Sequence, residues 1–447
     1  MKNTRKRSII VLLLTLSFLC GLGFYSYKLT INAKNWAFKP INAHLSMHGL
    51  TEASKILDRN DVVLAQSIGG QRIYHEDEYI RRAMLHSVGD EKGYISTAIQ
   101  NLFKPELFGY NFITGINLPT FLKNKQDIKL NLDSNLCKLA LQKFGDKKGA
   151  ASIYNYKTGE IICMLSTPTY DINHPPDIKN EKTENYEGVY LNKVLSGCLT
   201  PGSIFKIITA ISAIDNLPNW DSKTFECHSK EIIESEKITC MASHGKVNLK
   251  DAMKESCNIF FGNLAIELGA EKMQKTANSV GFNKPVEVDG IKTNPSLYDL
   301  SNASKASIGW SGIGQHKNLL NPAHTLTILG AIANEGTAIM PKIVKHDAPT
   351  QSKTYISCET ANKIKEIMRY NVKNKYGDSL FPGLEVCAKT GTAEIGEGKE
   401  PHAWMVGFSS TEEDPFAFVV VVENAGLGRK IAAPIASALM NAAAKCS

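Results

Sequence analysis

Pro201-Gly202-Ser203-Ile204-Phe205-Lys206, followed by apolar residues up to Ile211, is the stretch of sequence that decides the fold. The Pro-Gly pair predicts a turn, and the apolar residues predict that this turn opens directly into a buried helix. Because residues three apart share one face of a helix, Lys206 is expected one turn below Ser203. A serine hydroxyl beside an amine that can take its proton is a typical arrangement of a nucleophile and its base.

Two further motifs follow in order along the chain, Ser256-Cys257-Asn258 and Lys389-Thr390-Gly391-Thr392. Each motif is short enough to occur by chance, because a second S-x-x-K stands at 243–246 and a second K-T-G at 157–159. The S-x-x-K copy at 243–246 lacks a helical apolar pattern and is interpreted as a loop. The second copy lies between two β-like runs and is interpreted as a hairpin turn. Context therefore selects Ser203, not Ser243, as the candidate nucleophile.

The expected chemistry requires Lys206 to be neutral for part of the time. Burial among apolar neighbours and a second cation, Lys389, both disfavour its ammonium form. Ser256 could bridge the two lysines and relay a proton to a leaving group. The amide of Asn258 could form hydrogen bonds with both Lys206 and a substrate carbonyl.

The strand that carries Lys389 is expected to hold the substrate. The hydroxyls of Thr390 and Thr392 suit a terminal carboxylate, and Gly391 would let substrate backbone lie against the strand. The backbone N–H groups of Ser203 and Thr392 are the expected oxyanion hole.

The region 126–447 is predicted to be a mixed α/β domain. The expected elements are a strand at 127–132, a helix at 133–144, a hairpin at 150–165, helices at 249–280 and 322–334, strands at 386–394, 403–409 and 416–423, and a closing helix at 432–445. We expect the hairpin and the three C-terminal strands to form one antiparallel sheet flanked by helices. Residues 30–125 mix short helical and extended signals and are expected to form a small α+β domain.

Residues 1–29 are expected to anchor the chain in a membrane. Four basic residues precede an uncharged apolar run, 8–25, that is long enough to span a hydrocarbon core. The basic flank predicts a cytoplasmic N-terminus and an extracytoplasmic remainder. A cleaved signal peptide is the alternative, but no small-x-small cleavage site follows the run.

Charge and cysteine content restrict the remaining functions. The net charge of +7 lies partly in the anchor flank, and no Lys/Arg run is interleaved with aromatic residues, so nucleic-acid binding is not expected. Among the ten cysteines, Cys227 and Cys240 bracket a hairpin-like stretch and could form a disulfide. Cys198, Cys257 and Cys387 flank motifs and are interpreted as small buried hydrophobic residues. The sequence holds no HExxH, no CxxC and no paired Cys/His cluster, so neither a metal nor a cofactor is predicted.

The three motifs and their surroundings resemble those of class B penicillin-binding proteins, which are monofunctional D,D-transpeptidases of peptidoglycan. Further matching segments are 156–161, 166–171, 195–203, 309–315, 402–408 and Glu423-Asn424. By this resemblance, the fold is a penicillin-binding/β-lactamase-like transpeptidase domain on a small pedestal, with one N-terminal transmembrane helix. The pedestal keeps Arg72-Ile73-Tyr74 and the segment 86–89, but Thr97-Ala98-Ile99-Gln100 replaces the glycine and acidic residue that are common in the family.

The resemblance implies that the substrate is a stem pentapeptide ending in D-Ala-D-Ala. Ser203 would form the acyl-enzyme, D-Ala would leave, and an amine of a neighbouring stem peptide would complete the cross-link. β-Lactams would acylate the same serine. The implied partner is a polytopic membrane glycosyltransferase of the family that serves cell shape, division and sporulation.

Two other functions are carried as alternatives. A serine β-lactamase needs a carboxylate that activates water for deacylation, and no acidic Ω-loop pattern occurs between Asn258 and Lys389. A protein that binds β-lactams or stem peptides without turnover would be signalled by a lost Ser, Lys or Asn, and all three are present. Four aromatic residues could either line the substrate groove or pack in the core, and His86 is interpreted as structural. These four residues are Tyr170, Trp310, His402 and Trp404.

Overall fold

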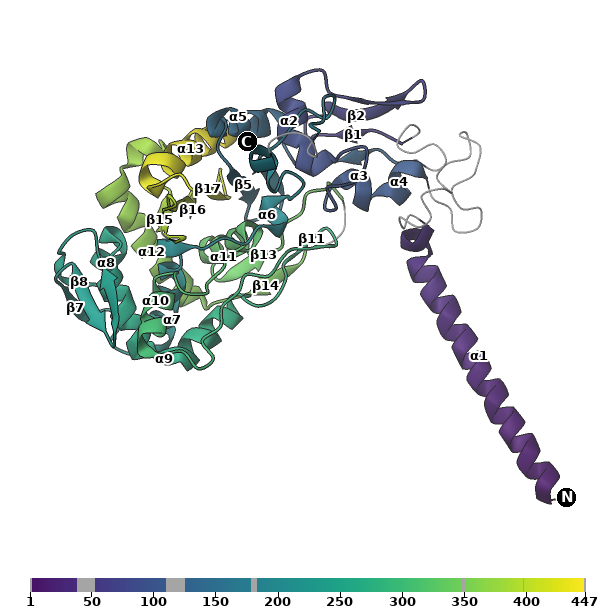
Figure 1. Ribbon diagram of the computed structural model, residues 1–447, viewed down its shortest axis with the longest axis horizontal. Coiled ribbons are helices and arrows are strands. Elements are labelled where there is room, and N and C mark those ends of the chain that lie inside the picture. The colour runs from purple at the N-terminus through teal and green to yellow at the C-terminus, as the bar shows by residue number, and fades with distance from the viewer. Residues whose placement is uncertain are drawn as a thin grey trace.

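The computed structural model describes residues 2–37, 53–109, 125–177, 183–346, 350–396 and 398–445. Helix α1 (Lys2–Ala37) extends away from the rest of the chain (Figure 1). Its segment Thr4–Ala33 has a mean hydropathy of 2.2 in its most apolar window, and that window is 0% buried within the chain. The helix is therefore long and apolar enough to cross a membrane, and it continues beyond the predicted span of 8–25.

A five-stranded antiparallel sheet forms the centre of the C-terminal region, in the order β15-β16-β17-β5-β6. Its strands are β5 (Gly149–Asn155), β6 (Ile161–Thr167), β15 (Cys387–Ala393), β16 (His402–Phe408) and β17 (Phe416–Val422). Strands β16 and β17 are buried along their whole length, as expected for strands covered on both faces. The predicted sheet of one hairpin and three C-terminal strands is confirmed.

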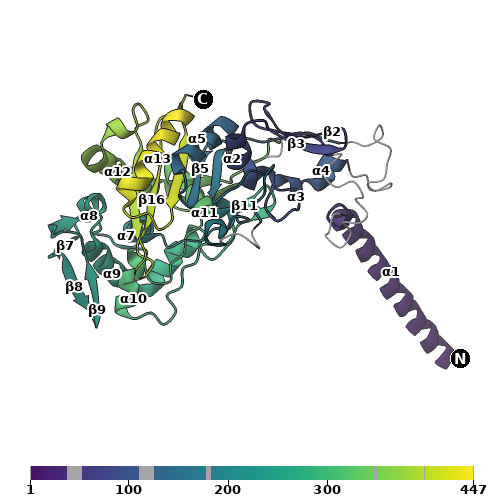
Figure 2. The same cartoon turned by 45° about the horizontal axis from the view of Figure 1, so that its top comes forward.

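Helices cover both faces of this sheet (Figures 1 and 2). Helices α5 (Ser134–Phe144) and α13 (Gly428–Ala443) pack together against β6, β16 and β17, and α11 (Pro322–Ala333) packs against β5, β16 and β17. Helix α7 (Lys206–Asn216) lies against α9 (Asn258–Ser279) and α12 (Cys358–Asn371). The smaller helical elements are α6 (Lys193–Ser196), α8 (Leu249–Glu255) and α10 (Lys305–Gly312).

Helix α13 begins one turn earlier than the predicted 432–445. Its first residue, Gly428, lies directly on the sheet, because a Cβ there would be only 2.3 Å from the carbonyl oxygen of Gly391. Glycine permits this approach but is a weak helix former, which is why the start of the helix escapes a propensity argument.

A second sheet lies in the N-terminal region, in the order β3-β2-β1-β4. Its elements are β1 (Ile56–Leu57), β2 (Val63–Ile68), β3 (Gln71–Tyr74), β4 (Ile128–Lys129) and the helices α2 (Glu78–Val88), α3 (Ile99–Leu102) and α4 (Lys104–Phe108). Strand β4 pairs in parallel with β1, although residues from 126 onwards were assigned to the C-terminal domain. The pairing shows that residues on the two sides of the expected boundary share one sheet, and the boundary itself stays a prediction. Residues 110–124, which lead up to that boundary, lie outside the described part of the chain.

Gln100, in the segment 97–100 where the chain departs from the family pattern, forms hydrogen bonds with a buried arginine. The Arg72 guanidinium Nε donates to Gln100 Oε1 at 2.9 Å, and Gln100 Nε2 donates to the carbonyl oxygen of Gly89 at 3.0 Å. A neutral amide thus accepts from the arginine in this segment.

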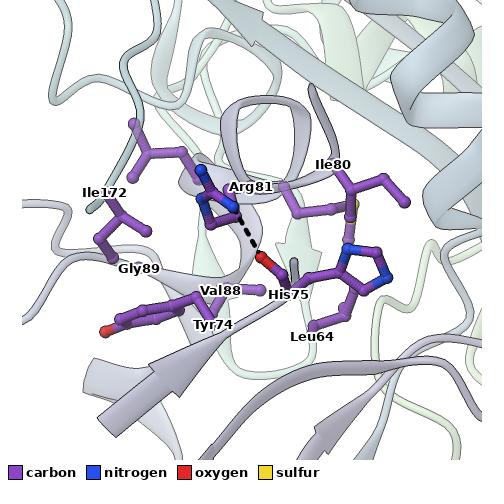
Figure 3. Close-up of a pocket in the computed structure, with 10 residues that line it drawn as sticks. Leu64, Tyr74, His75, Ile80, Arg81, Val88, Gly89 and Ile172 are labelled. Atoms are coloured by element: carbon purple, nitrogen blue, oxygen red, sulfur yellow. Dashed lines mark hydrogen bonds between the residues drawn. The ribbon is translucent and has the colours of Figure 1, made fainter. Parts of the chain in front are cut away.

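A small apolar pocket lies between this sheet and α2 (Figure 3). It is lined by Leu64, Tyr74, His75, Ile80, Arg81, Met84, Leu85, Val88, Gly89 and Ile172. The Arg81 guanidinium donates to the carbonyl oxygen of His75 at 2.9 Å and forms two hydrogen bonds, of 2.7 and 2.6 Å, with the carboxylate of Asp171, which follows β6. The pocket shares no residue with the three motifs. Its lining comes from the N-terminal region and, at Ile172, from the C-terminal region, so the pocket lies at the junction between the two regions.

The variant Arg81→Ala is expected to lower the free energy of unfolding by about 2–3 kcal/mol, because it leaves a largely buried carboxylate without its bidentate partner. The guanidinium holds the pKa of Asp171 well below its usual range. The measurement is urea denaturation of the full chain in detergent. The matched control is Arg82→Ala, which removes a more exposed ion pair with Glu78 and should cost less than about 1 kcal/mol. Equal losses in the two variants would contradict the assigned role of Arg81.

Candidate active site

Ser203 lies in a single 3₁₀ turn, Gly202–Ile204, that leads into α7. Gly202 has a φ of 53°, and a Cβ at this residue would be 2.5 Å from the carbonyl oxygen of Thr392. Only glycine therefore allows the turn to lie directly against β15. One turn further along, Lys206 Nζ donates to Ser203 Oγ at 3.1 Å, as the sequence predicted.

The Lys206 side chain is completely buried and surrounded by hydrogen-bond acceptors. Its Nζ donates to Asn258 Oδ1 at 2.7 Å and to the carbonyl oxygen of Ser256 at 2.6 Å, and it lies 3.1 Å from Ser256 Oγ. Burial lowers the pKa of Lys206 to about 7, although the nearby thiols of Cys240 and Cys257 partly oppose this shift. Near neutral pH, part of the Lys206 population can therefore act as a base.

Ser256 occupies a left-handed turn between α8 and α9, with φ 56° and ψ 40°. This conformation is uncommon for a residue other than glycine. It directs the hydroxyl between the two lysines, because Lys389 Nζ donates to Ser256 Oγ at 2.9 Å. The predicted bridge between Lys206 and Lys389 is present. The helix-rich pattern over 249–280 did not predict the break that creates this bridge.

Lys389 and Asn258 complete the buried polar centre. Lys389 Nζ also donates to the carbonyl oxygen of Thr390 at 2.9 Å, and burial, followed by the charge of Lys206, holds the pKa of Lys389 well below its usual value. Asn258 Nδ2 donates to the carbonyl oxygen of Thr239 at 2.7 Å. The expected contact of Asn258 with a substrate carbonyl stays a prediction.

The threonines of the third motif are held by residues that the sequence did not single out. Tyr376 Oη lies 3.1 Å from Thr390 Oγ1 and accepts from the Thr390 backbone N–H at 3.1 Å. Thr392 Oγ1 accepts from the backbone N–H of Gly428 at 3.4 Å. Tyr376 ends a short π-helical segment, Val372–Tyr376, and no local pattern marks it as a neighbour of β15.

The structure gives Gly391 a second role, and its expected contact with substrate backbone stays a prediction. A Cβ at this residue would be 2.8 Å from Ile204 Cγ1 and 3.1 Å from the carbonyl oxygen of Pro201. The glycine therefore makes room for the turn that carries Ser203. The resulting approach of Gly202 to Thr392 brings together the two backbone segments proposed as the oxyanion hole, and that role stays a prediction.

The second copies of the motifs lie outside this centre. Ser243 is in a loop, as predicted, and its Oγ donates to the carbonyl oxygen of Cys227 at 2.9 Å. The loop prediction is wrong for Gly245 and Lys246, which begin strand β10 (Gly245–Asn248). The segment 157–159 forms the predicted turn between β5 and β6.

Three of the aromatic residues left open are packing residues, and so is His86. Trp404 is fully buried, and its Nε1 donates to the carbonyl oxygen of Thr200 at 3.0 Å. His402 Nδ1 accepts from the backbone N–H of Asn424 at 3.2 Å. Tyr170 packs in a small cluster with Leu85, Ile95, Ala98 and Val189, and His86 Nε2 is 2.8 Å from the carbonyl oxygen of Val189. Trp310 is half-buried and packs against the main core.

Two expectations about cysteine are overturned. Cys227 and Cys240 are free thiols, so the predicted disulfide is wrong. The sequence argument also found no paired Cys/His cluster, but the fold brings Cys227, Cys240, His244 and Cys257 together, with ligand atoms within 4.8 Å of one another. The spacing Cys-x12-Cys-x3-His-x12-Cys is the only signal in the sequence, and it matches none of the short motifs that were searched.

Known proteins resemble this chain over most of its length. The penicillin binding protein transpeptidase domain family matches residues 149–441. The chain is 27% identical over 396 residues to the peptidoglycan D,D-transpeptidase PbpA of Mycobacterium tuberculosis, which covers 78% of this chain and 80% of that protein.

Solved structures share the fold. The ceftriaxone acyl-enzyme complex of penicillin-binding protein A from M. tuberculosis has a TM-score of 0.78 at 24% identity, covering 89% of this chain and 99% of that chain. The D,D-transpeptidase domain of a peptidoglycan glycosyltransferase from Eggerthella lenta has a TM-score of 0.74 at 22% identity, with coverage of 89% and 99%.

Proposed function

The chain belongs to the penicillin-binding protein transpeptidase family, and from this premise we propose that it is a class B peptidoglycan D,D-transpeptidase that works through an acyl-enzyme on Ser203. The observation that carries the proposal is the position of Lys206 Nζ, buried and 3.1 Å from Ser203 Oγ. A buried amine with a lowered pKa can take the hydroxyl proton as the oxygen attacks a carbonyl carbon.

Acylation moves one proton from Ser203, by way of Lys206 and then Ser256, to the departing D-Ala amine. Ser203 Oγ forms a bond to the penultimate D-Ala carbonyl carbon of a stem peptide, and its proton passes to Lys206. The backbone N–H groups of Ser203 and Thr392 stabilise the oxyanion. Ser256 Oγ, between Lys206 and Lys389, then passes a proton to the departing D-Ala amine as the peptide bond breaks.

The second half-reaction reverses these roles. The amine of a neighbouring stem peptide attacks the ester carbonyl carbon, and its excess proton passes to the neutral Lys206. The bond to Ser203 breaks, and Lys206 returns that proton to the serine oxygen. The hydroxyls of Thr390 and Thr392, on the edge strand β15, hold the donor carboxylate, and β-lactams acylate Ser203 because they present a comparable carbonyl and carboxylate.

Location and partners follow the same proposal. Helix α1 anchors the chain, its basic start lies on the cytoplasmic side, and the transpeptidase domain lies outside the membrane. A polytopic membrane glycosyltransferase supplies the glycan strands that carry the stem peptides. A complex of a related penicillin-binding protein with MreC from Helicobacter pylori gives a precedent for a protein partner in this fold.

A β-lactamase is less consistent with the contacts in the described part of the chain. Hydrolysis needs a carboxylate that activates water near the acyl-enzyme. The recorded side-chain partners of Ser203, Lys206, Ser256 and Lys389 are hydroxyls, amines and one amide, and none is a carboxylate.

The test is labelling of the full chain in detergent with fluorescent penicillin, followed by a chase with unlabelled antibiotic. We expect a covalent adduct that mass spectrometry locates on the Ser203 peptide and that persists for many minutes, since no carboxylate in the described part of the chain contacts the catalytic side chains. Rapid release would favour the β-lactamase. Absence of any adduct would favour a protein that binds without turnover, and it would contradict the proposal.

A further inference from the structure

The insert β7–β10 (224–248) projects from the domain at the end remote from the N-terminal sheet (Figures 1 and 2). It consists of β7 (Thr224–Cys227), β8 (Lys230–Ile233), β9 (Glu236–Thr239) and β10, with β7 paired to β10 and β8 paired to β9. The ends of β7 and β9 and the start of β10 lie beside the turn between α8 and α9. The insert therefore touches the second catalytic motif directly.

Four soft ligand atoms converge at this contact, and we call them the thiol cluster. Cys227 ends β7, Cys240 follows β9, His244 precedes β10, and Cys257 is the N-cap residue of α9. Cys227 and Cys257 are fully buried, whereas Cys240 and His244 are half-buried. The cluster thus has a protected interior and one more accessible side.

The spacing of these atoms matches a tetrahedral zinc site. Bond lengths of about 2.3 Å for Zn–S and 2.0 Å for Zn–N place two sulfur ligands about 3.8 Å apart and a sulfur and a nitrogen about 3.5 Å apart. Cys240 Sγ and Cys257 Sγ are 3.7 Å apart, and Cys227 Sγ is 3.3 Å from His244 Nδ1. The four atoms need only small movements to surround one ion.

The backbone around the cluster is arranged to stabilise thiolate sulfur. Cys240 Sγ accepts from the N–H groups of Asn258 at 3.0 Å and Ile259 at 3.4 Å, at the N-terminus of α9. Cys257 Sγ accepts from the N–H of Phe260 at 3.4 Å. Such N–H donors and the positive end of a helix favour the deprotonated sulfur that a metal requires.

Two of the sulfur atoms face each other within hydrogen-bond distance. Cys240 Sγ and Cys257 Sγ are 3.7 Å apart, and either atom can be the donor. A divalent cation can take the place of the shared proton and bind both sulfur atoms as thiolates, releasing the protons to solvent.

We propose that Cys227, Cys240, His244 and Cys257 bind one Zn²⁺ ion in a closed structural site that ties the insert β7–β10 to the Ser256-Cys257-Asn258 turn. Three thiolates and one imidazole form a ligand set typical of structural zinc, and soft sulfur ligands disfavour magnesium and calcium. Because Cys257 lies between Ser256 and Asn258, the ion fixes the backbone that presents both side chains to Lys206. Its role is to position these residues, since it touches no reacting atom.

The first test is the metal content of the full chain, purified in detergent without chelator and measured by plasma mass spectrometry. We expect one equivalent of zinc. Cys240→Ser and His244→Ala should each weaken zinc binding at least about 100-fold. Losing only a residue that forms a hydrogen bond with a metal ligand already lowers metal affinity by about 10–100-fold. The matched control Cys358→Ser removes an exposed free thiol and should keep its zinc.

Cobalt substitution provides a readout that needs no variant. Replacing the ion with Co²⁺ in the full chain should produce the sulfur-to-metal charge-transfer absorption and the visible bands of tetrahedral thiolate coordination. Zinc below a tenth of an equivalent after exposure to excess Zn²⁺, or a Cys240–Cys257 disulfide in the protein purified under reducing conditions, would overturn the proposal. Equal zinc content in Cys240→Ser and Cys358→Ser would also overturn it.

The positioning role rests on the proposed function and is tested separately. Removal of zinc by a chelator should slow acylation by penicillin at least about 10-fold, and added Zn²⁺ should restore the rate. If the purified protein holds a full equivalent of zinc but acylates at the same rate after the zinc is removed, the positioning role alone is overturned. Full zinc content with no acylation in any form would instead count against the transpeptidase, so the two failures are distinguishable.

Discussion

Replacing Ser203 with alanine is expected to abolish covalent labelling by fluorescent penicillin. The side chain supplies the only atom that the proposed mechanism bonds to the β-lactam carbonyl carbon, and alanine offers no oxygen in its place. Ser203 is half-exposed beside a buried base, so the substitution removes one hydrogen bond to Lys206 and leaves the surrounding core in place. The loss should therefore affect chemistry with little effect on folding.

The measurement is the rate of labelling of the full chain in detergent, with urea denaturation as a check on folding. The matched control is Ser243→Ala, which alters the serine of the other S-x-x-K copy. Its hydroxyl contacts the backbone of Cys227, so labelling should stay at the wild-type rate. Normal labelling of Ser203→Ala would show that the nucleophile is misassigned.

Replacing Lys206 with alanine is expected to slow acylation by about 10²–10⁴-fold, the usual contribution of a positioned general base. The variant also leaves Asn258 Oδ1 and the carbonyl oxygen of Ser256 without their ammonium donor, which should lower the free energy of unfolding by about 1–3 kcal/mol. The control Lys157→Ala changes the lysine of the second K-T-G, which lies in the exposed turn between β5 and β6, and should leave the rate unchanged.

The pH dependence of acylation separates a base from a merely structural lysine. Burial lowers the pKa of Lys206 to about 7, and only the neutral amine can accept the Ser203 proton. The wild-type rate should therefore rise with pH, pass its half-maximum near pH 7, and reach a plateau above it. The residual rate of Lys206→Ala should lack this rise. If the rise near pH 7 persists in the variant, the group that titrates is not Lys206.

The sequence determined those features that depend on neighbours along the chain. The apolar runs of β16 and β17 specify buried strands, because a strand covered on both faces cannot alternate with polar residues. The pair Ser203 and Lys206 required only helical periodicity to be placed on one face. The uncharged run within α1 is long enough to span a membrane, whatever the rest of the chain does.

The tertiary structure decided what depends on contacts between distant segments. The left-handed conformation of Ser256 interrupts a helix-rich stretch. The turn places the Ser256 hydroxyl between two lysines that come from distant segments of the chain. Tyr376 reaches Thr390 through the packing of a π-helical segment, and Gly391 makes room for the Ser203 turn. None of these relationships has a periodicity, because a close approach between two segments leaves no repeat in either one.

The thiol cluster is the clearest case of the same limit. Its four residues are spread over 227–257 and come from one strand end, the loop between β9 and β10, and a helix cap. Local reasoning assigned Cys257 to the core and left open a disulfide between Cys227 and Cys240, since each cysteine was judged by its own neighbours. Metal coordination depends on distances between side chains, and the folding of the insert against α9 sets those distances. The sequence thus predicted the candidate catalytic residues and determined the central sheet, while the tertiary structure alone placed a ligand set beside them.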